Sequence, residues 1–277
     1  MQFTREESTS RLKELAAAGE PIIGAGAGTG MSAKFAERGG VDLLIIYNSG
    51  RYRMNGRGSL AGILPYGDAN EIVVDMGRQV LPVVEDTPVL AGVNGTDPFR
   101  QMDVFIEDLR RQGFSGVQNF PTVGLIDEDS SYRQNLEETG MGYDKEVEMI
   151  REAADQGMLT CPYVFTEEQA RAMTEAGADV IVSHMGLTTS GDIGAETALD
   201  LETAAERVQA HHDAAKDVNE DVMVICHGGP IAWPDDAEYV LNNTEGVVGF
   251  FGASSIERLP TEEAIQEQAR EFKEIEF

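Results

Sequence analysis

Short apolar runs alternate with segments of helical spacing along the whole chain, and this alternation constrains the fold more than any other feature. Most of the runs are aliphatic without polar alternation, which is typical of parallel strands covered on both faces. They lie at 21–26, 41–50, 88–95, 116–121, 159–165, 179–186, 222–229 and 246–254. Eight strands, each followed by a helix, predict a single (β/α)₈ TIM barrel that spans residues 1–277. A doubly wound open sheet is the rival arrangement.

The segments between the runs carry helix start and stop signals. An extra N-terminal helix is expected before the first strand, from Thr4 to Ala18. Thr166 is a candidate N-cap, and Gln169 three residues later would complete a capping box. The connections at 51–70 and 122–143 are long, and both follow the carboxyl ends of strands, where barrel enzymes build their sites. Further helices are expected at 97–112, 144–156 and 200–219.

The chain is strongly acidic. It has 49 Asp and Glu against 21 Lys and Arg, a formal net charge of −28. Such a surface repels nucleic acid and anionic membranes, so neither is an expected partner. At molar salt the Debye length falls to about 3 Å and the self-repulsion of the acidic surface is screened. The composition therefore indicates a protein from a halophile.

The sequence shows neither of the signals that would direct the chain to a membrane or to export. No apolar run approaches the roughly 20 residues of a membrane helix, and residues 1–15 lack the apolar core of a signal peptide. The two cysteines, Cys161 and Cys226, cannot build a disulfide framework and fit a reducing compartment. We therefore expect a cytoplasmic protein.

Small and polar residues gather where the predicted strands end. Because the strands of a parallel barrel end at one rim, we expect these residues to converge on one mouth. The run GAGAGTG (24–30) is not a GxGxxG dinucleotide fingerprint, because Thr29 stands where the last glycine is required. The candidate catalytic residues are His184, His227, Asp97 and Asn94, and the candidate substrate- or anion-binding residues are Gly24, Gly26, Asn48, Arg51, Asn119, Ser183, Gly228, Gly229, Gly252, Ala253, Ser254, Ser255 and Arg258.

The ends of the seventh and eighth strands suggest an anion cradle. Barrels often bind phosphate with these two loops and the N-terminus of a short helix. Gly228 and Gly229 can expose backbone N–H groups, and GASSIERLP (252–260) leads small residues into a helical turn. Arg258 would be a fixed positive charge beside this cradle or a structural partner of Glu257. The alternative is a plain turn with a helix cap.

Two of the four histidines are candidates for proton transfer. His184 and His227 end neighbouring strands, and the ordinary pKa of histidine suits it to acid–base work. Side chains alternate along a strand, so Cys226 and His227 cannot both point inward. Cys226 is therefore expected to pack against helices. His211 and His212 are expected on the outer face of their helix.

A metal site is a weaker hypothesis. Asp97 is a candidate Mg²⁺ ligand, and the acidic stretch at 127–129 offers further oxygen atoms. No ligand spacing requires a metal, so the sequence establishes no cofactor and leaves Mg²⁺ as a candidate. In so acidic a chain, residues 127–129 also fit a solvated surface.

The motifs NGTDPF (94–99), NFPTVGLIDED (119–129), SHMGLTTSG (183–191), CHGGPI (226–231) and GFFGASSIERLP (249–260) together resemble the TIM-barrel family of phosphoenolpyruvate hydrolase-like proteins. The same domain is similar to the C-terminal part of a plant antiviral resistance protein. The resemblance covers nearly the whole chain and implies a relation to the phosphoenolpyruvate mutase and isocitrate lyase superfamily. Members of that superfamily place acidic metal ligands at the ends of middle strands, where this chain has fewer carboxylates.

These observations predict a hydrolase or lyase for a small phosphorylated or carboxylated metabolite, phosphoenolpyruvate-like, that works through an enolate. His184 or His227 would move the proton, while Asn48, Arg51, Asn94 and Asp97 would orient the substrate. No Lys lies at a strand end, so a Schiff-base mechanism is disfavoured. A non-catalytic ligand-sensing or assembly barrel and a metal-dependent hydrolase are the alternatives. We also expect a homo-oligomer.

Overall fold

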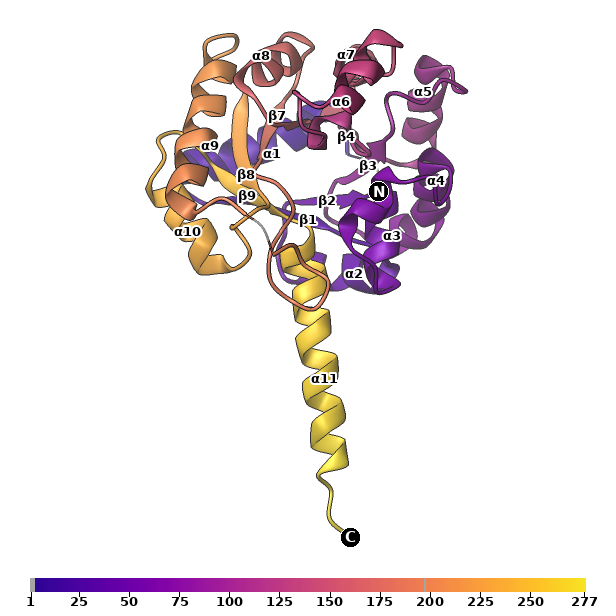
Figure 1. Cartoon of the computed structure of the whole chain (residues 1–277), viewed down its shortest axis with the longest axis vertical. Coiled ribbons are helices and arrows are strands. Elements are labelled where there is room, and N and C mark those ends of the chain that lie inside the picture. Colours follow the sequence, from indigo (N-terminus) through magenta and orange to yellow (C-terminus); the bar gives the residue numbers. More distant parts are fainter. Residues whose placement is uncertain (1–2, 197) are drawn as a thin grey trace.

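A parallel sheet curls round on itself inside a layer of helices (Figure 1). The computed structural model describes residues 3–196 and 198–277. Within them the strands are β1 (Ile22–Gly26), β2 (Leu43–Ile46), β3 (Val89–Val93), β4 (Gly116–Asn119), β5 (Leu159–Thr160), β6 (Tyr163–Val164), β7 (Val180–His184), β8 (Met223–His227) and β9 (Gly249–Gly252). All the pairings between them are parallel. The predicted TIM-barrel class is confirmed.

The fifth apolar run forms two short strands instead of the one that was predicted. β5 pairs with β4 and β6 pairs with β7, so the sheet runs in the order β5-β4-β3-β2-β1-β9-β8-β7-β6. Pro162 lies between the two halves and has no N–H for a ladder bond. Because only Cys161 and Pro162 separate β5 from β6, the two edges of the sheet meet there. The barrel therefore closes through the chain itself.

The helices fill the intervals between the strands. They are α1 (Arg5–Ala18), α2 (Gly30–Arg38), α3 (Asn48–Met54), α4 (Ala69–Val80), α5 (Met102–Gln112), α6 (Ser131–Glu138), α7 (Tyr143–Asp155), α8 (Glu167–Glu175), α9 (Leu201–Lys216), α10 (Pro234–Asn242) and α11 (Leu259–Lys273). Short turns are η1 (Ser59–Ile63), η2 (Leu81–Val83), η3 (Val123–Leu125) and the π-helical turn η4 (Ser254–Arg258). None of the helices in the described part of the chain is long and apolar enough to cross a membrane.

The predicted caps are confirmed in part. The extra N-terminal helix is present as α1, where Thr4 and Glu7 form a reciprocal capping box. Thr166 caps α8, but the Gln169 side chain accepts from the N–H of Phe165, so the predicted box is incomplete. The helix expected from residue 97 begins only at Met102, because residues 97–100 form a turn around the Asp97 carboxylate.

Cys226 and His227, neighbours at the end of β8, face opposite sides of the barrel wall. Cys226 is fully buried in an apolar cluster with residues of α9 and α10, so it faces the helices as alternation predicts. Burial raises the pKa of the Cys226 thiol to about 12. His227, one residue later, lines a cavity in the mouth of the barrel. A thiolate nucleophile activated by its neighbour is therefore ruled out at this position.

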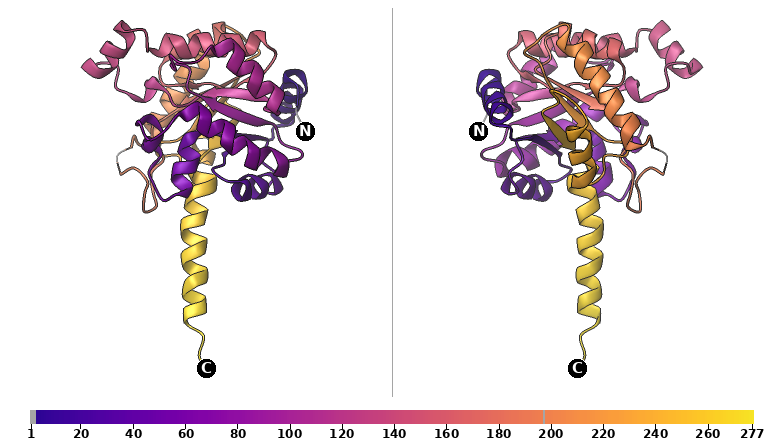
Figure 2. Two further views of the ribbon diagram at one scale, coloured as in Figure 1. Left: turned by 90° about the vertical axis from the view of Figure 1, so that its right-hand side faces the viewer. Right: turned by 90° about the vertical axis from the view of Figure 1, so that its left-hand side faces the viewer.

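The last helix departs from the barrel plan. Figures 1 and 2 show α11 projecting from the body as a free rod, away from the sheet that it follows. Leu259, at its first position, is the only residue of α11 that is buried.

Candidate active site

A small cavity lined by buried side chains lies at the carboxyl ends of the strands. Its volume is about 20 Å³, which is room for roughly one water molecule. His184 of β7 and His227 of β8 are register partners, and their ring centroids lie 4.6 Å apart. The Tyr163 ring packs against both, at 4.7 Å from His184 and 5.0 Å from His227. The two histidines that sequence reasoning selected are therefore brought together.

The two imidazoles differ in the hydrogen-bonding role that each can play in this cavity. Nδ1 of His184 accepts from the N–H of Gly186 at 3.0 Å, so in the neutral ring the proton sits on Nε2. Nδ1 of His227 bonds the carbonyl oxygen of Phe251, which can only accept, so its proton sits on Nδ1 and Nε2 keeps a lone pair. His184 therefore offers an N–H donor and His227 offers a proton acceptor.

Burial keeps both rings neutral. It lowers the pKa of His227 to about 4, and it lowers the pKa of His184 well below its ordinary value, with a smaller contribution from His227. Neither ring carries a positive charge at neutral pH. A neutral imidazole N–H still donates a hydrogen bond to a developing oxyanion.

A buried ion pair completes the cavity, and sequence reasoning missed it. Arg53 of α3 and Glu257 of η4 are each about 1% exposed, with Nη2 and Oε2 3.2 Å apart. Glu257 also accepts from the N–H of Gly28 and from Ser32 Oγ. The Nε atom of Arg53 is buried and has no hydrogen-bond partner in the described residues. This free donor suits an anionic group of a ligand.

Arg51 was the predicted arginine, but Arg53 is the arginine that lines the small cavity. Arg51 pairs with Asp75 of α4 at 2.6 Å and is half-exposed on the outside of the barrel. Residues two apart on a helix point about 200° apart, so α3 can direct only one of the two arginines into the mouth. The stretch NSGRYR carries no signal that says which.

Two segments cover the cavity. η1 and the loop at 186–195 line a second space of about 150 Å³ directly above it, and the two spaces share Ser59, Leu187, Thr188 and Ser254. These segments must separate before a metabolite of several carbons can reach the histidines. Within the long connection at 51–70, η1 is thus the part that lies against the cavity.

A larger cavity of about 560 Å³ lies beside this mouth. Asn48, Asn94 and Asp97 line it, as does Thr122. The Asp97 carboxylate is engaged by Asn70 at 3.0 Å and by Arg100 at 3.1 Å. In residues 3–196 and 198–277 no three His, Cys, Asp or Glu side chains form a group that could hold a metal. This set of donors does not match a three-ligand Mg²⁺ site.

The glycine pair after β8 has a packing role. Gly228 and Gly229 have φ angles of +76° and +59°. A Cβ added at Gly228 would lie 2.3 Å from the Gly186 carbonyl oxygen, and one added at Gly229 would lie 2.3 Å from the Met185 carbonyl oxygen. The Gly229 N–H donates to the Gly186 carbonyl at 2.8 Å. The Gly229 N–H that the predicted anion cradle would use thus joins the β7 and β8 loops in this structure.

Of the predicted residues in and after β1 and β9, some allow close packing and others line the mouth. A Cβ added at Gly24 would meet the Phe251 ring, and one added at Gly252 would meet the Ile256 side chain. A Cβ added at Gly26 would meet Ala253 and Arg53. These three glycines thus let large side chains fill the barrel. Ala253 and Ser254 line the mouth beside His227.

Several other predicted positions lie outside the mouth. Ser183 points to the helix layer, where its Oγ bonds Nδ1 of His211 at 2.7 Å. His211 is consequently buried, which corrects the expectation that it lies on an outer face. Ser255 lines a groove on the outer wall. Arg258 bonds Glu262 and the Ser190 carbonyl, and so ties η4 to the 186–195 loop.

Asn119 is occupied by structural bonds. Its amide accepts from the Tyr163 N–H at 2.7 Å and donates to Glu146 at 2.7 Å. It thus stands in for a ladder bond where Pro162 interrupts the fifth run. Glu146 of α7, which the sequence did not single out, also accepts from Thr122 Oγ1 and the Val123 N–H. Burial raises the pKa of Glu146 to about 7.

Comparison with known proteins identifies the family. The chain matches the family described as phosphoenolpyruvate hydrolase-like over residues 7–275. It belongs to this family. The ToMV susceptible protein tm-1(GCR26) and the ToMV resistance protein Tm-1(GCR237) of Solanum lycopersicum are each 61% identical over 265 residues, which cover 96% of this chain. The chain spans only 35% of the length of each tomato protein.

Solved structures of the phosphoenolpyruvate mutase and isocitrate lyase superfamily share the fold. Oxaloacetate acetylhydrolase has a TM-score of 0.62 at 17% identity, over 99% of this chain and 88% of that one. The superfamily member 2,3-dimethylmalate lyase has 0.60 at 18% identity, over 99% and 89%. Phosphonopyruvate hydrolase in complex with oxalate and Mg++ has 0.57 at 16% identity, over 96% and 87%. At these identities the likeness shows that the fold is shared.

Proposed function

We propose that the chain is a hydrolase or lyase that acts on a small carboxylated or phosphorylated metabolite and stabilises an enolate oxygen in the mouth of the barrel. One observation carries the proposal. Two neutral histidines present a donor and an acceptor to one small cavity, beside the free Nε donor of Arg53. Membership of the phosphoenolpyruvate hydrolase-like family supports the substrate class.

The residues suit the hydrolysis of an enol phosphate. Water adds to phosphorus, the bond to the enol oxygen breaks and phosphate leaves, and the enolate takes on carbon the proton that His227 would have accepted from water, which gives the keto acid. The His227 Nε2 lone pair would accept the proton that water loses. The His184 Nε2–H would donate to the enolate oxygen, and Arg53 would hold the carboxylate. Because His184, His227 and Arg53 are buried, these hydrogen bonds are stronger than in solution.

The test is turnover by the whole chain in high KCl, with phosphoenolpyruvate, phosphonopyruvate, oxaloacetate and 2,3-dimethylmalate as the substrates. His184→Asn and His227→Asn should each lower kcat at least 100-fold on an accepted substrate, the usual range for loss of an acid–base group. His212→Asn, on α9 and away from the residues that line the cavity, is the control. Thermal unfolding of each variant shows that it is folded.

Three results would change the proposal. Unchanged kcat in both variants would remove the histidines from the reaction. Saturable binding of these acids without turnover would favour the ligand-sensing barrel. Loss of turnover on chelation and its return with Mg²⁺ would favour the metal-dependent hydrolase, and Asp97→Asn would then test the ligand predicted for it.

A further inference from the structure

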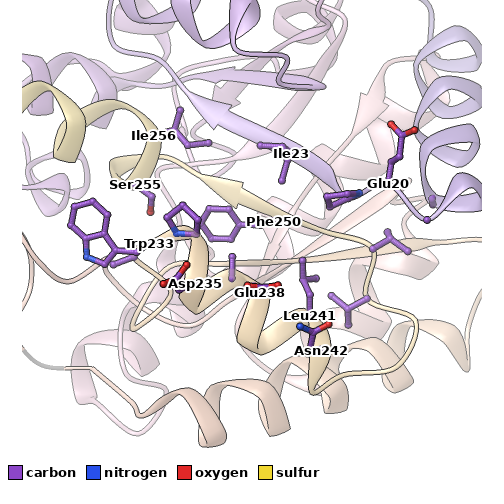
Figure 3. A pocket seen from close by; sticks show the side chains of 18 residues that line it. Glu20, Ile23, Trp233, Asp235, Glu238, Leu241, Asn242, Phe250, Ser255 and Ile256 are labelled. Carbon is purple, nitrogen blue, oxygen red and sulfur yellow. The ribbon is translucent and has the colours of Figure 1, made fainter.

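Tyr163 carries a buried hydroxyl that makes no hydrogen bond in the described part of the chain. Within residues 3–196 and 198–277, seven buried side-chain polar atoms have no hydrogen-bond partner. Of these seven, only Arg53 Nε and Tyr163 Oη belong to residues that line the small cavity. Ser255, by contrast, lines the groove on the outer wall (Figure 3). Buried polar groups normally have partners, so two free ones in one cavity indicate a place for a ligand.

The fold holds the Tyr163 side chain in place at both ends. At the backbone, the Tyr163 N–H donates to Asn119 Oδ1 at 2.7 Å, and the Tyr163 carbonyl accepts from the Tyr143 hydroxyl. The ring packs against the imidazoles of His184 and His227. Because these contacts already order the ring, a ligand that meets its hydroxyl does not have to immobilise it.

The free group on Tyr163 is a hydrogen-bond donor at neutral pH. Burial raises the pKa of its phenol well above the ordinary value, Tyr47 acts in the same direction, and the charge of Arg53 opposes them by less. The phenol therefore keeps its proton, and its O–H has no acceptor among the described residues. The free Nε–H of Arg53 is also a donor and cannot accept. One donor on β6 and one on α3 thus belong to the lining of the same cavity.

Two free donors match a group that has two acceptor oxygens. Glu257 already balances the charge of Arg53, so the direction of the donors selects the ligand more than net charge does. A carboxylate has two oxygens in one plane and pairs well with arginine. A carboxamide has one acceptor oxygen, and its NH₂ group would face one of the donors. A tetrahedral phosphoryl group is larger, and the cavity of about 20 Å³ has less room for it than for a flat group.

We propose that Tyr163 and Arg53 together bind one carboxylate of the substrate, and that the Tyr163 hydroxyl makes this subsite select a carboxylate over a phosphate. The proposal rests on the proposed function, since it places the acid group of the same metabolite in the same mouth. The rest of the metabolite extends into the space of about 150 Å³ beside η1 and the 186–195 loop, which shares Ser59 and Thr188 with the small cavity. The phosphoryl end of an enol phosphate therefore lies in that upper space.

The test compares two tyrosine-to-phenylalanine changes. Tyr163→Phe removes the hydroxyl of the subsite and keeps the ring that packs on the histidines. Tyr52→Phe is the matched control, because the Tyr52 hydroxyl is also buried without a partner in the described residues but lines neither of the two spaces. Each change removes a hydroxyl that makes no hydrogen bond in the fold, so both variants should unfold at or above the midpoint of the unchanged chain.

Binding of pyruvate, the keto acid of phosphoenolpyruvate, is measured by ligand-observed NMR at one fixed KCl concentration, because chloride can compete for an anion site. Tyr163→Phe should raise the Kd about 10- to 100-fold, the usual effect of losing a hydrogen bond to a charged group, and Tyr52→Phe should leave it unchanged. Neutral pyruvamide should bind the unchanged chain about tenfold more weakly than pyruvate. The Kd of inorganic phosphate should be the same in all three proteins.

The binding measurement does not need turnover, so its result is separate from that of the proposed reaction. Weaker pyruvate binding in Tyr163→Phe alone supports the subsite even if no substrate is turned over. The subsite is overturned by an equal Kd for pyruvate in all three proteins, by no binding of pyruvate to the unchanged chain, or by a loss confined to phosphate. Each of these results leaves the reaction to be judged by the variants of His184 and His227.

Discussion

Replacing Glu146 with Gln should change how stability depends on pH. The carboxylate is fully buried between α7 and the end of β4, and it accepts from Asn119, Thr122 and the Val123 N–H at 2.7, 2.7 and 2.8 Å. These bonds favour the ionised form and lower the pKa, but the loss of solvation outweighs them and raises it from 4.5 to about 7. The folded chain therefore binds this proton more tightly than the unfolded chain.

The magnitude follows from that difference. Between pH 4.5 and about 7 the folded state is protonated at Glu146 and the unfolded state is not, so stability falls as the pH rises. At about 1.4 kcal/mol for each pH unit, the total loss is roughly 3 kcal/mol and is complete just above pH 7. The Gln variant does not titrate there. It leaves one buried donor unpaired, at a cost of about 1–3 kcal/mol that does not vary with pH.

The assay is equilibrium unfolding of both proteins in guanidinium chloride at pH 5, 6, 7 and 8. Glu146→Gln should be the less stable protein at pH 5, and the gap should close or reverse by pH 8. The difference between the two curves cancels the titration of all other groups. Parallel stability profiles would show that Glu146 is already ionised at pH 5 and would refute the argument.

Three further experiments test the packing of the barrel. Gly229→Ala should destabilise the fold by more than about 2 kcal/mol in thermal or chemical unfolding, because φ is +59° and the new Cβ would lie 2.3 Å from the Met185 carbonyl; an unchanged midpoint would contradict this. Arg53→Met should cost about 3–5 kcal/mol by leaving Glu257 charged and buried, and a second change, Glu257→Gln, should recover much of it. Cys226 should resist iodoacetamide at pH 8 in the folded protein, because burial raises its pKa to about 12; rapid alkylation seen by mass spectrometry would place it elsewhere.

The barrel could be predicted because its signals are local and repeated. Apolar runs, their lack of alternation and the caps between them each depend on neighbours in the sequence. Alternation also separated Cys226 from His227. The same rule applied one strand earlier would have removed Ser183, because Ser183 pairs in register with Cys226 and His184 pairs with His227.

The ion pair of the mouth could not be predicted from the sequence around either residue. Arg53 and Glu257 lie 204 positions apart in the chain, and nothing near either residue marks it as buried. In a chain with 49 acidic residues, one buried carboxylate cannot be distinguished by composition. Glu146 was missed for the same reason, since its environment comes from β4 and the turn after it.

Polar residues at strand ends are thus better evidence for the rim than for the ligand. A rim has two tasks: it must satisfy the backbone where the sheet ends, and it must leave donors and acceptors free for chemistry. Asn119 and Gly229 are consumed by the first task, since their bonds close the barrel at Pro162 and join two loops. His184 and His227 each spend only Nδ1 on the backbone and keep Nε2 for the cavity. A candidate site residue is therefore one whose polar atom remains without a partner once the structural hydrogen bonds are made. Only the tertiary structure shows which residues these are.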